Sequence, residues 1–338
     1  MDAKVAVAYA LTAGACAFLA VACSSSHLGG AALPAPGDAS YALPYVGDDS
    51  GDIFADGAPA VASVRIAHMS PDAPALDVCV ALHGTTDFQG PMIAQLAASL
   101  AVGGSADGGN QNDAGPLGLA FSQVSAYLSL APGQYDVRLV AAGATTCAAL
   151  AAVDGGATPF APPDSVNLPA LQANTFTTLL IAGDLTPAGD DAPLGVSLLP
   201  DDDELAGGAA SLRAINAVPS LPALDFGLGS GAAWMPMLTD VAFGKASSMS
   251  GPGEDPVDAN GYVPIQTFAG QAMSACVPSS DAGVDVATAA AVDVELGAIA
   301  TVMAIGGKTG DSAQPPELLI CIDNEPSGGL LSDCSVGQ

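Results

Sequence analysis

This 338-residue sequence contains seven cysteines, and their thiols are its most reactive side chains. A thiol can be lipidated, can bind a metal, or can pair with a second thiol in an oxidising compartment. We expect Cys79 to pair with Cys147, because closing that long loop would stabilise the fold by about 4 kcal/mol. Nearer the C-terminus we favour a Cys321–Cys334 disulfide, which would pin the chain end to the last strand and leave Cys276 buried and free. A Cys276–Cys321 disulfide is the alternative.

No set of residues in the sequence resembles a catalytic centre. The three histidines, His27, His68 and His83, are too few and too scattered to supply the converging ligands of a zinc site. The G-x-S-x-G pattern of serine hydrolases is absent, and G-x-G clusters lack the strand–helix context of a phosphate loop. We therefore expect no catalytic residues, no metal and no cofactor, and a secreted hydrolase is the least favoured function.

Two pairs of opposite charge recur at one spacing. Arg65 precedes Asp77 by the same number of residues as Arg213 precedes Asp225. We expect each pair to face each other across two antiparallel strands, on the side away from the core, where it would contribute about 0.2–1 kcal/mol. The segment SPDAP, residues 70–74, is expected to be the tight connection between those strands, with its aspartate bonded to backbone amides. A ligand-binding loop is the alternative.

An export signal precedes these residues. Residues 5–22 form an uncharged apolar run, typical of a secretory signal peptide, with an uncleaved anchor helix as the alternative. The sequence LAVAC at 19–23 resembles the bacterial lipobox, and this resemblance implies a diacylglyceryl group on Cys23. Cys16 is a poorer lipidation candidate, and simple secretion is a further alternative. Ser24 resembles the residue after the cysteine in lipoproteins sent to an outer membrane.

Composition limits the class of partner. Against 35 Asp plus Glu there are 6 Lys plus Arg, a formal net charge of -29. This charge repels phosphate backbones and excludes nucleic-acid binding. Half of the residues are hydrophobic, enough for packed cores.

The sequence also contains an internal duplication. Residues 62–80 align without a gap on 210–228, and 177–184 align on 300–307. Apolar and polar residues alternate in these blocks, as in strands with one face in a core and the other toward water. Short strands and Gly/Pro turns favour two antiparallel β-sandwiches. Pro132-Gly133 predicts a hairpin between 127–130 and 135–140, and PMIAQLAASL at 91–100 predicts a short helix.

The segment RIAHMSPDAPALDVCV, residues 65–80, resembles the opening of the domain of unknown function 4397. GQYDVRLVAAG, residues 133–143, is similar to a later strand of that family. The resemblance implies an immunoglobulin-like sandwich on a bacterial surface and no agreed activity. The combination of lipobox, spacer and paired domains resembles Ala-rich lipoproteins of myxobacteria.

The expected organisation follows from these features: signal peptide 1–22, flexible tether 23–60, first sandwich 61–205, second sandwich 206–326 and C-terminal tail 327–338. The leading hypothesis is a lipid-anchored envelope protein, at the outer membrane, whose sandwiches bind or adhere to a surface ligand or protein. A purely structural envelope component and a secreted protein are the alternatives.

Overall fold

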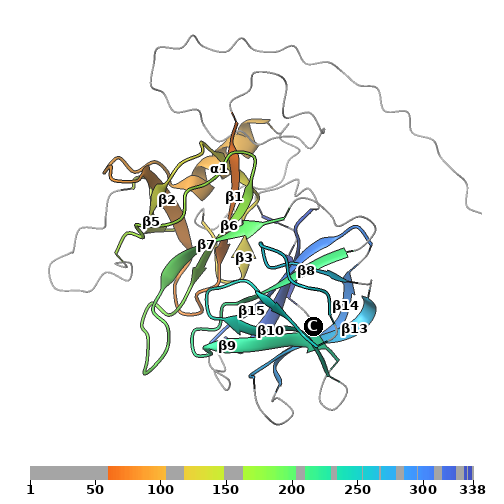
Figure 1. Cartoon of the computed structure of the whole chain (residues 1–338). Helices are drawn as coiled ribbons and strands as arrows, with labels where there is room; N and C mark the ends of the chain where they lie inside the picture. The colour runs from red at the N-terminus through yellow and green to blue at the C-terminus, as the bar shows by residue number, and fades with distance from the viewer. Residues whose placement is uncertain are drawn as a thin grey trace, which may run out of the picture. The chain divides into compact units, whose positions relative to one another are not determined.

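The computed structural model describes most of the chain between residues 60 and 336 (Figure 1). The described residues are 60–103, 118–147, 163–202, 210–229, 234–252, 254–265, 268–278, 285–294, 296–307, 314–324, 331–332 and 334–336. Cys23, the expected signal peptide and nearly all of the expected tether lie outside them. The described part of the chain is nearly all β and forms β-sandwich domains, as the sequence predicts. In the described part, no helix is long and apolar enough to span a bilayer.

The described residues of the first sandwich form two sheets and one helix. Its elements are β1 (Ala62–His68), β2 (Leu76–Leu82), α1 (Met92–Gly103), β3 (Gln123–Val124), β4 (Leu128–Leu130), β5 (Tyr135–Ala141), β6 (Phe176–Ala182) and β7 (Gly195–Asp201). One sheet has the order β3-β1-β6-β7, with β4 also paired to β1. The other sheet is β2-β5, and these two strands lie side by side next to α1 in Figure 1. β1 and β6 are parallel, and the other pairs are antiparallel.

The core of the first sandwich follows the alternation of its strands. Ala62, Val64 and Ile66 of β1 face the same apolar cluster as Leu76 and Val78 of β2. Because alternate side chains of a strand point to opposite faces, these residues meet between the two sheets. Helix α1 begins one residue after and ends three residues after the predicted segment 91–100, and it packs against β2.

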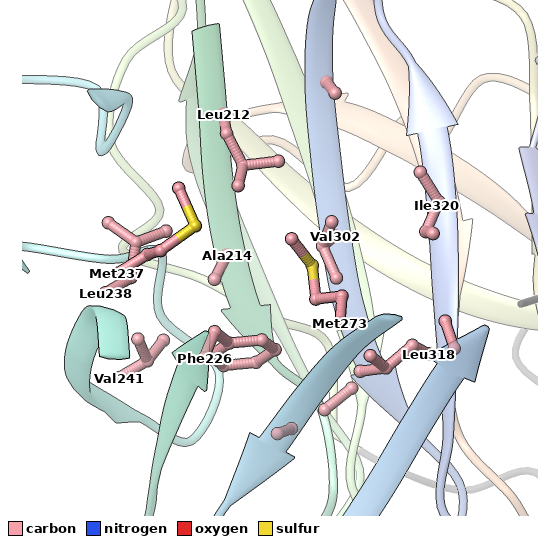
Figure 2. Packing of buried hydrophobic residues seen from close by; sticks show 14 of the residues in the cluster. Leu212, Ala214, Phe226, Met237, Leu238, Val241, Met273, Val302, Leu318 and Ile320 are labelled. Carbon is pink, nitrogen blue, oxygen red and sulfur yellow. The ribbon is translucent and has the colours of Figure 1, made fainter. Parts of the chain in front are cut away.

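The second sandwich places a second pair of sheets face to face. Its strands are β8 (Ala210–Asn216), β9 (Ala223–Leu228), β10 (Met235–Ala242), β11 (Met249–Ser250), β12 (Val263–Ile265), β13 (Phe268–Cys276), β14 (Asp285–Val294), β15 (Ile299–Ile305), β16 (Glu317–Ile322) and β17 (Cys334–Val336). One sheet has the order β12-β8-β15-β16-β17 and the other β11-β10-β9-β13-β14. Figure 2 shows the buried cluster between them, with Leu212, Val302 and Ile320 on one side and Phe226 and Met273 on the other.

Two predicted connections are wrong. Residues around Pro132-Gly133 do not form a hairpin, because β4 pairs with β1 and β5 pairs with β2 in the opposite sheet. Likewise, β1 and β2 are not paired with each other, so the SPDAP segment crosses from one sheet to the other. In both places the turn residues identify a reversal of the chain but not the strand that receives hydrogen bonds.

The outer faces of β1 and β8 are buried, whereas the alternation predicted that they would face water. Arg65 on β1 and Arg213 on β8 are both fully buried. A third apolar cluster joins the sheet of β1 to the sheet of β8, and contains Leu180 of β6 and Met303 of β15. The two sandwiches therefore cover each other's outer faces and share one interface.

Both favoured disulfides are present. Cys79 is bonded to Cys147 and Cys321 to Cys334, and Cys276 is free and buried. The first bond ties β2 to the segment after β5, and the second ties β16 to β17.

Candidate functional site

A cluster of buried ionisable groups lies in the interface between the two sandwiches. Arg65 Nη1 donates to Asp323 Oδ1 over 2.7 Å, and Arg65 Nε donates to the Thr178 hydroxyl on β6 over 2.8 Å. The carboxylate of Asp201, at the end of β7, lies 3.4 Å from the same Nε. The remaining nitrogen of Arg65, Nη2, is buried and has no hydrogen-bond partner in the described part of the chain.

Arg213 repeats this arrangement from the opposite side. Its Nε donates to the Thr301 hydroxyl on β15 over 2.9 Å, and its Nη2 donates to Asp201 Oδ1. Each guanidinium thus bonds a threonine in its own sheet and a carboxylate carried by the other sandwich. The cluster is electrically balanced, with two arginines and two aspartates, and the side chains of both ion pairs are at most 1% exposed.

Two tyrosines complete the cluster. The Tyr127 hydroxyl donates to Asp201 Oδ2 over 2.8 Å, and the Tyr262 hydroxyl donates to Asp323 Oδ2 over 2.9 Å. The guanidinium carbon of Arg65 lies 5.2 Å from the centre of the Tyr127 ring, and that of Arg213 lies 4.8 Å from the Tyr262 ring. These contacts add cation–π attraction to the ion pairs.

The charges stabilise one another's ionised forms. Burial alone would raise the pKa of Asp201, but the positive charges of Arg213 and Arg65 hold it below its usual value. Burial raises the pKa of both tyrosine hydroxyls, so they remain protonated donors. A carboxylate held by two guanidiniums and a threonine is a poor base and a poor nucleophile. The cluster is therefore suited to holding the sandwiches together.

The expected pairing of Arg65 with Asp77 and of Arg213 with Asp225 is wrong. Asp77 accepts hydrogen bonds from the amides of Ile93, 2.8 Å, and Ala94, 2.9 Å, and so caps the start of α1. Asp225 accepts from the amide of Asp240 over 2.7 Å. In each pair, the arginine and the aspartate lie on strands of different sheets. The arginine bonds residues of the interface, whereas the aspartate bonds backbone amides of its own sandwich.

His68 has a structural role that Asn216 reproduces in the second sandwich. His68 Nδ1 accepts from the Ser70 amide at 3.3 Å, and Nε2 lies 3.2 Å from the Pro74 carbonyl. Asn216 Oδ1 accepts from the Val218 amide, and its Nδ2 donates to the Leu221 carbonyl. Each side chain accepts a hydrogen bond from the amide two residues later in the chain. Each also donates a hydrogen bond to a carbonyl at the far end of the same turn. Burial lowers the pKa of His68 to about 4, against the opposing effect of backbone hydrogen bonds.

The SPDAP segment is also engaged within the fold. Asp72 Oδ1 accepts from the Leu185 amide over 2.6 Å, and Oδ2 accepts from the amide and the hydroxyl of Thr186. These bonds fasten the β1–β2 connection to the connection between β6 and β7. The aspartate does bond backbone amides, but these belong to a distant segment and not to its own turn.

A groove of about 340 Å³ opens at one side of the first sandwich. It lies between the start of β7 and the segment 163–168, which is bridged to β5 through Ser165 and Val137. Its lining is largely apolar: Leu139, Pro163, Asp164, Ser165, Val166, Leu168, Leu194, Gly195 and Val196. Asp164, at its rim, binds Arg138 through two hydrogen bonds of 2.7 and 2.8 Å. Among the described strands, β7 pairs with β6 alone, and the residues at its start, Leu194, Gly195 and Val196, line this groove.

The described residues contain no group of three or more His, Cys, Asp or Glu side chains placed to hold a metal ion.

Sequence reasoning missed Thr178, Thr301, Tyr127, Tyr262 and the two interface aspartates. One signal was available, because the aligned blocks 177–184 and 300–307 place Thr178 on Thr301.

The comparison with family models agrees with the motif at residues 65–80. Residues 62–227 match the domain of unknown function DUF4397. The DUF4397 match begins with β1, includes Arg65, Thr178 and Asp201, and ends in β9. This match supports the resemblance to that family that the motif at residues 65–80 indicates. No curated protein matches the chain.

Proposed function

We propose that this protein is a non-catalytic lipoprotein of the cell envelope, whose first sandwich binds an extended polypeptide segment of a surface partner. The observation that carries the binding proposal is the groove beside β7. It combines an apolar lining with a strand edge that is unpaired within the described residues, and such an edge can receive a further strand. Main-chain hydrogen bonds would supply affinity, and the side chains of Leu194 and Val196 would select apolar residues.

Export and anchoring rest on the N-terminal sequence and the disulfides. Residues 5–22 and the lipobox-like sequence ending at Cys23 favour lipidation of that cysteine. Disulfides persist in oxidising compartments, which agrees with a position outside the cytoplasm. Ser24 favours the outer membrane, and the set of features resembles Ala-rich lipoproteins of myxobacteria. Secretion without a lipid is the alternative.

We also infer that the second sandwich is a diverged duplicate of the first. The parallel pair β8–β15 matches the parallel pair β1–β6, with Arg213 opposite Thr301 as Arg65 is opposite Thr178. Gly183 and Gly306 share a φ of +104°, and each lies directly against the backbone of a proline in the following loop. Similar sequence blocks thus coincide with similar local geometry.

The binding proposal can be tested by photo-crosslinking in the cells that produce the protein. A photoreactive phenylalanine analogue would replace Val166, which lines the groove and is 48% exposed. The matched control would carry the analogue at Leu296, which is 65% exposed and lies in the second sandwich. We expect irradiation to give one discrete adduct from position 166 only, and mass spectrometry to identify its attached component as a polypeptide.

Each outcome decides between the candidate functions. Equal labelling at both positions would show random contact, and no adduct at either would favour a structural envelope component without a discrete ligand. The anchoring part has a separate test, which is the intact mass of the protein purified from membranes. A chain that begins at Cys23 and carries a lipid mass supports anchoring, whereas an unprocessed, lipid-free chain rejects it.

A further inference from the structure

The end of the chain contacts both sandwiches. We define the C-terminal strap as Leu331, Ser332 and β17. Its Ser332 amide donates to the Val124 carbonyl of β3 over 2.9 Å, and its Ser332 hydroxyl donates to the Ser125 carbonyl over 2.7 Å. β17 pairs with β16 in the second sandwich. The strap therefore joins an edge of the first sandwich to an edge of the second.

The covalent bond holds the strap more firmly than its packing does. β17 has three residues, and Ser335 and Val336 are exposed, so pairing with β16 buries little apolar surface. Cys334 lies directly opposite Cys321 in this pairing and is bonded to it. Cys321 belongs to the buried apolar cluster of the interface, together with Val124 from the first sandwich, and the partly buried Cys334 packs against this cluster.

The two disulfides differ in access. Cys79 is fully buried, Cys147 is 9% exposed, and their bond lies in a small cluster inside the first sandwich. Cys334 is only half-buried, on the edge strand β17. Because thiol–disulfide exchange requires a thiolate to reach a sulfur, an external thiol attacks Cys334 more readily than either cysteine of the first disulfide.

We propose that the Cys321–Cys334 disulfide is a redox-controlled latch for the C-terminal strap. A dithiol reductant transfers two electrons and two protons to this bond, becomes a disulfide itself, and leaves Cys321 and Cys334 as thiols. The strap then leaves β3 and β16 and uncovers their edges. The two sandwiches remain joined, because the buried cluster of Arg65, Arg213 and their partners does not involve the strap.

The test is amide hydrogen exchange of the full chain, followed by mass spectrometry. Oxidised protein would be compared with protein treated with a limiting dithiol and then alkylated, so that the state of each cysteine is known. We expect alkylation at Cys321 and Cys334 before Cys79 and Cys147. In that partly reduced form, exchange of the strap should accelerate by roughly an order of magnitude or more, and that of β15 should not change.

A Cys334→Ser variant provides the matched control without any reductant. Its strap should exchange in oxidising buffer as the reduced strap does. Unchanged protection of the strap after selective reduction would overturn the proposal, because docking would not depend on the disulfide. Acceleration that also includes β8 and β15 would overturn it as well, because the bond would then hold the whole sandwich.

Discussion

Arg65 on the first strand of the first sandwich bonds Asp323 beyond the end of β16, 258 positions later in the chain and 2.7 Å away. The reciprocal bond runs from Arg213 of the second sandwich to Asp201 of the first. Each half of the molecule thus buries a positive charge that bonds a carboxylate of the other half. An unpaired buried charge is costly in free energy. Neither sandwich can therefore keep its arginine buried and paired in this way without the other.

Replacing Arg65 by Met should lower the free energy of unfolding by about 3–5 kcal/mol, because Asp323 then loses its buried counter-ion. Urea denaturation of the full chain would measure this loss. The companion variant Arg65→Met/Asp323→Asn removes both charges and keeps an acceptor for Tyr262 and Thr301. We expect the double variant to be less destabilised than the sum of the two single variants by about 0.5–3 kcal/mol. Strict additivity would mean that the two residues are not coupled.

The strands themselves could be predicted, because the alternation of Ala62, Val64 and Ile66 against polar neighbours is a local property of the sequence. Helix α1 could also be predicted, from the sequence PMIAQLAASL at 91–100. The motif at residues 65–80 also favours a sandwich, and residues 62–227 match the family that it resembles.

The burial of Arg65 could not be predicted from local pattern. An arginine at an outward position of a strand ordinarily faces water, and nothing near it in the sequence shows that a second sheet covers it. Its partners Thr178 and Asp323 lie 113 and 258 positions away. The pairing with Asp77 was wrong because spacing along the chain does not show that β1 and β2 belong to different sheets.

Acid should destabilise the first sandwich through His68. Burial lowers the pKa of this histidine from 6.5 to about 4, so its neutral form is the one that fits the fold. Between those two pH values the unfolded chain binds a proton that the folded chain does not. The free energy of unfolding should therefore be highest above about pH 6.5 and should fall by roughly 3 kcal/mol as the pH approaches 4.

Asn216 suggests the control for this titration. A His68→Asn variant keeps one acceptor and one donor in the same turn and has no proton to gain. The difference between the stability curves of the original protein and the variant isolates His68, because the carboxylates contribute equally to both. Curves that stay parallel from pH 7 to pH 4 would show that His68 does not titrate in this range.

The two disulfides should contribute unequally to stability. Cys79 and Cys147 are separated by 68 positions, and Cys321 and Cys334 by 13. In the chain-entropy description, the longer loop is worth about 4 kcal/mol and the shorter about 3 kcal/mol. We expect the Cys79→Ala/Cys147→Ala variant to unfold at lower urea concentration than the Cys321→Ala/Cys334→Ala variant. The reverse order would indicate that contacts of the strap outweigh loop entropy.

Gly306 occupies a position where both backbone conformation and space require glycine. Its φ is +104°, and a Cβ there would lie 2.4 Å from the Pro315 carbonyl oxygen. Gly297 has a similar φ of +92°, but a Cβ there meets nothing within 4 Å. Gly297→Ala should therefore carry only the conformational penalty, about 1–2 kcal/mol. Gly306→Ala should cost about 1–3 kcal/mol more, because the β15–β16 connection must shift.

Gly183→Ala should behave like Gly306→Ala, since its Cβ would lie 2.2 Å from the Pro193 carbonyl oxygen. Thermal unfolding of the three variants measures these differences, and equal destabilisation of all three would show that the close approach to the proline does not matter.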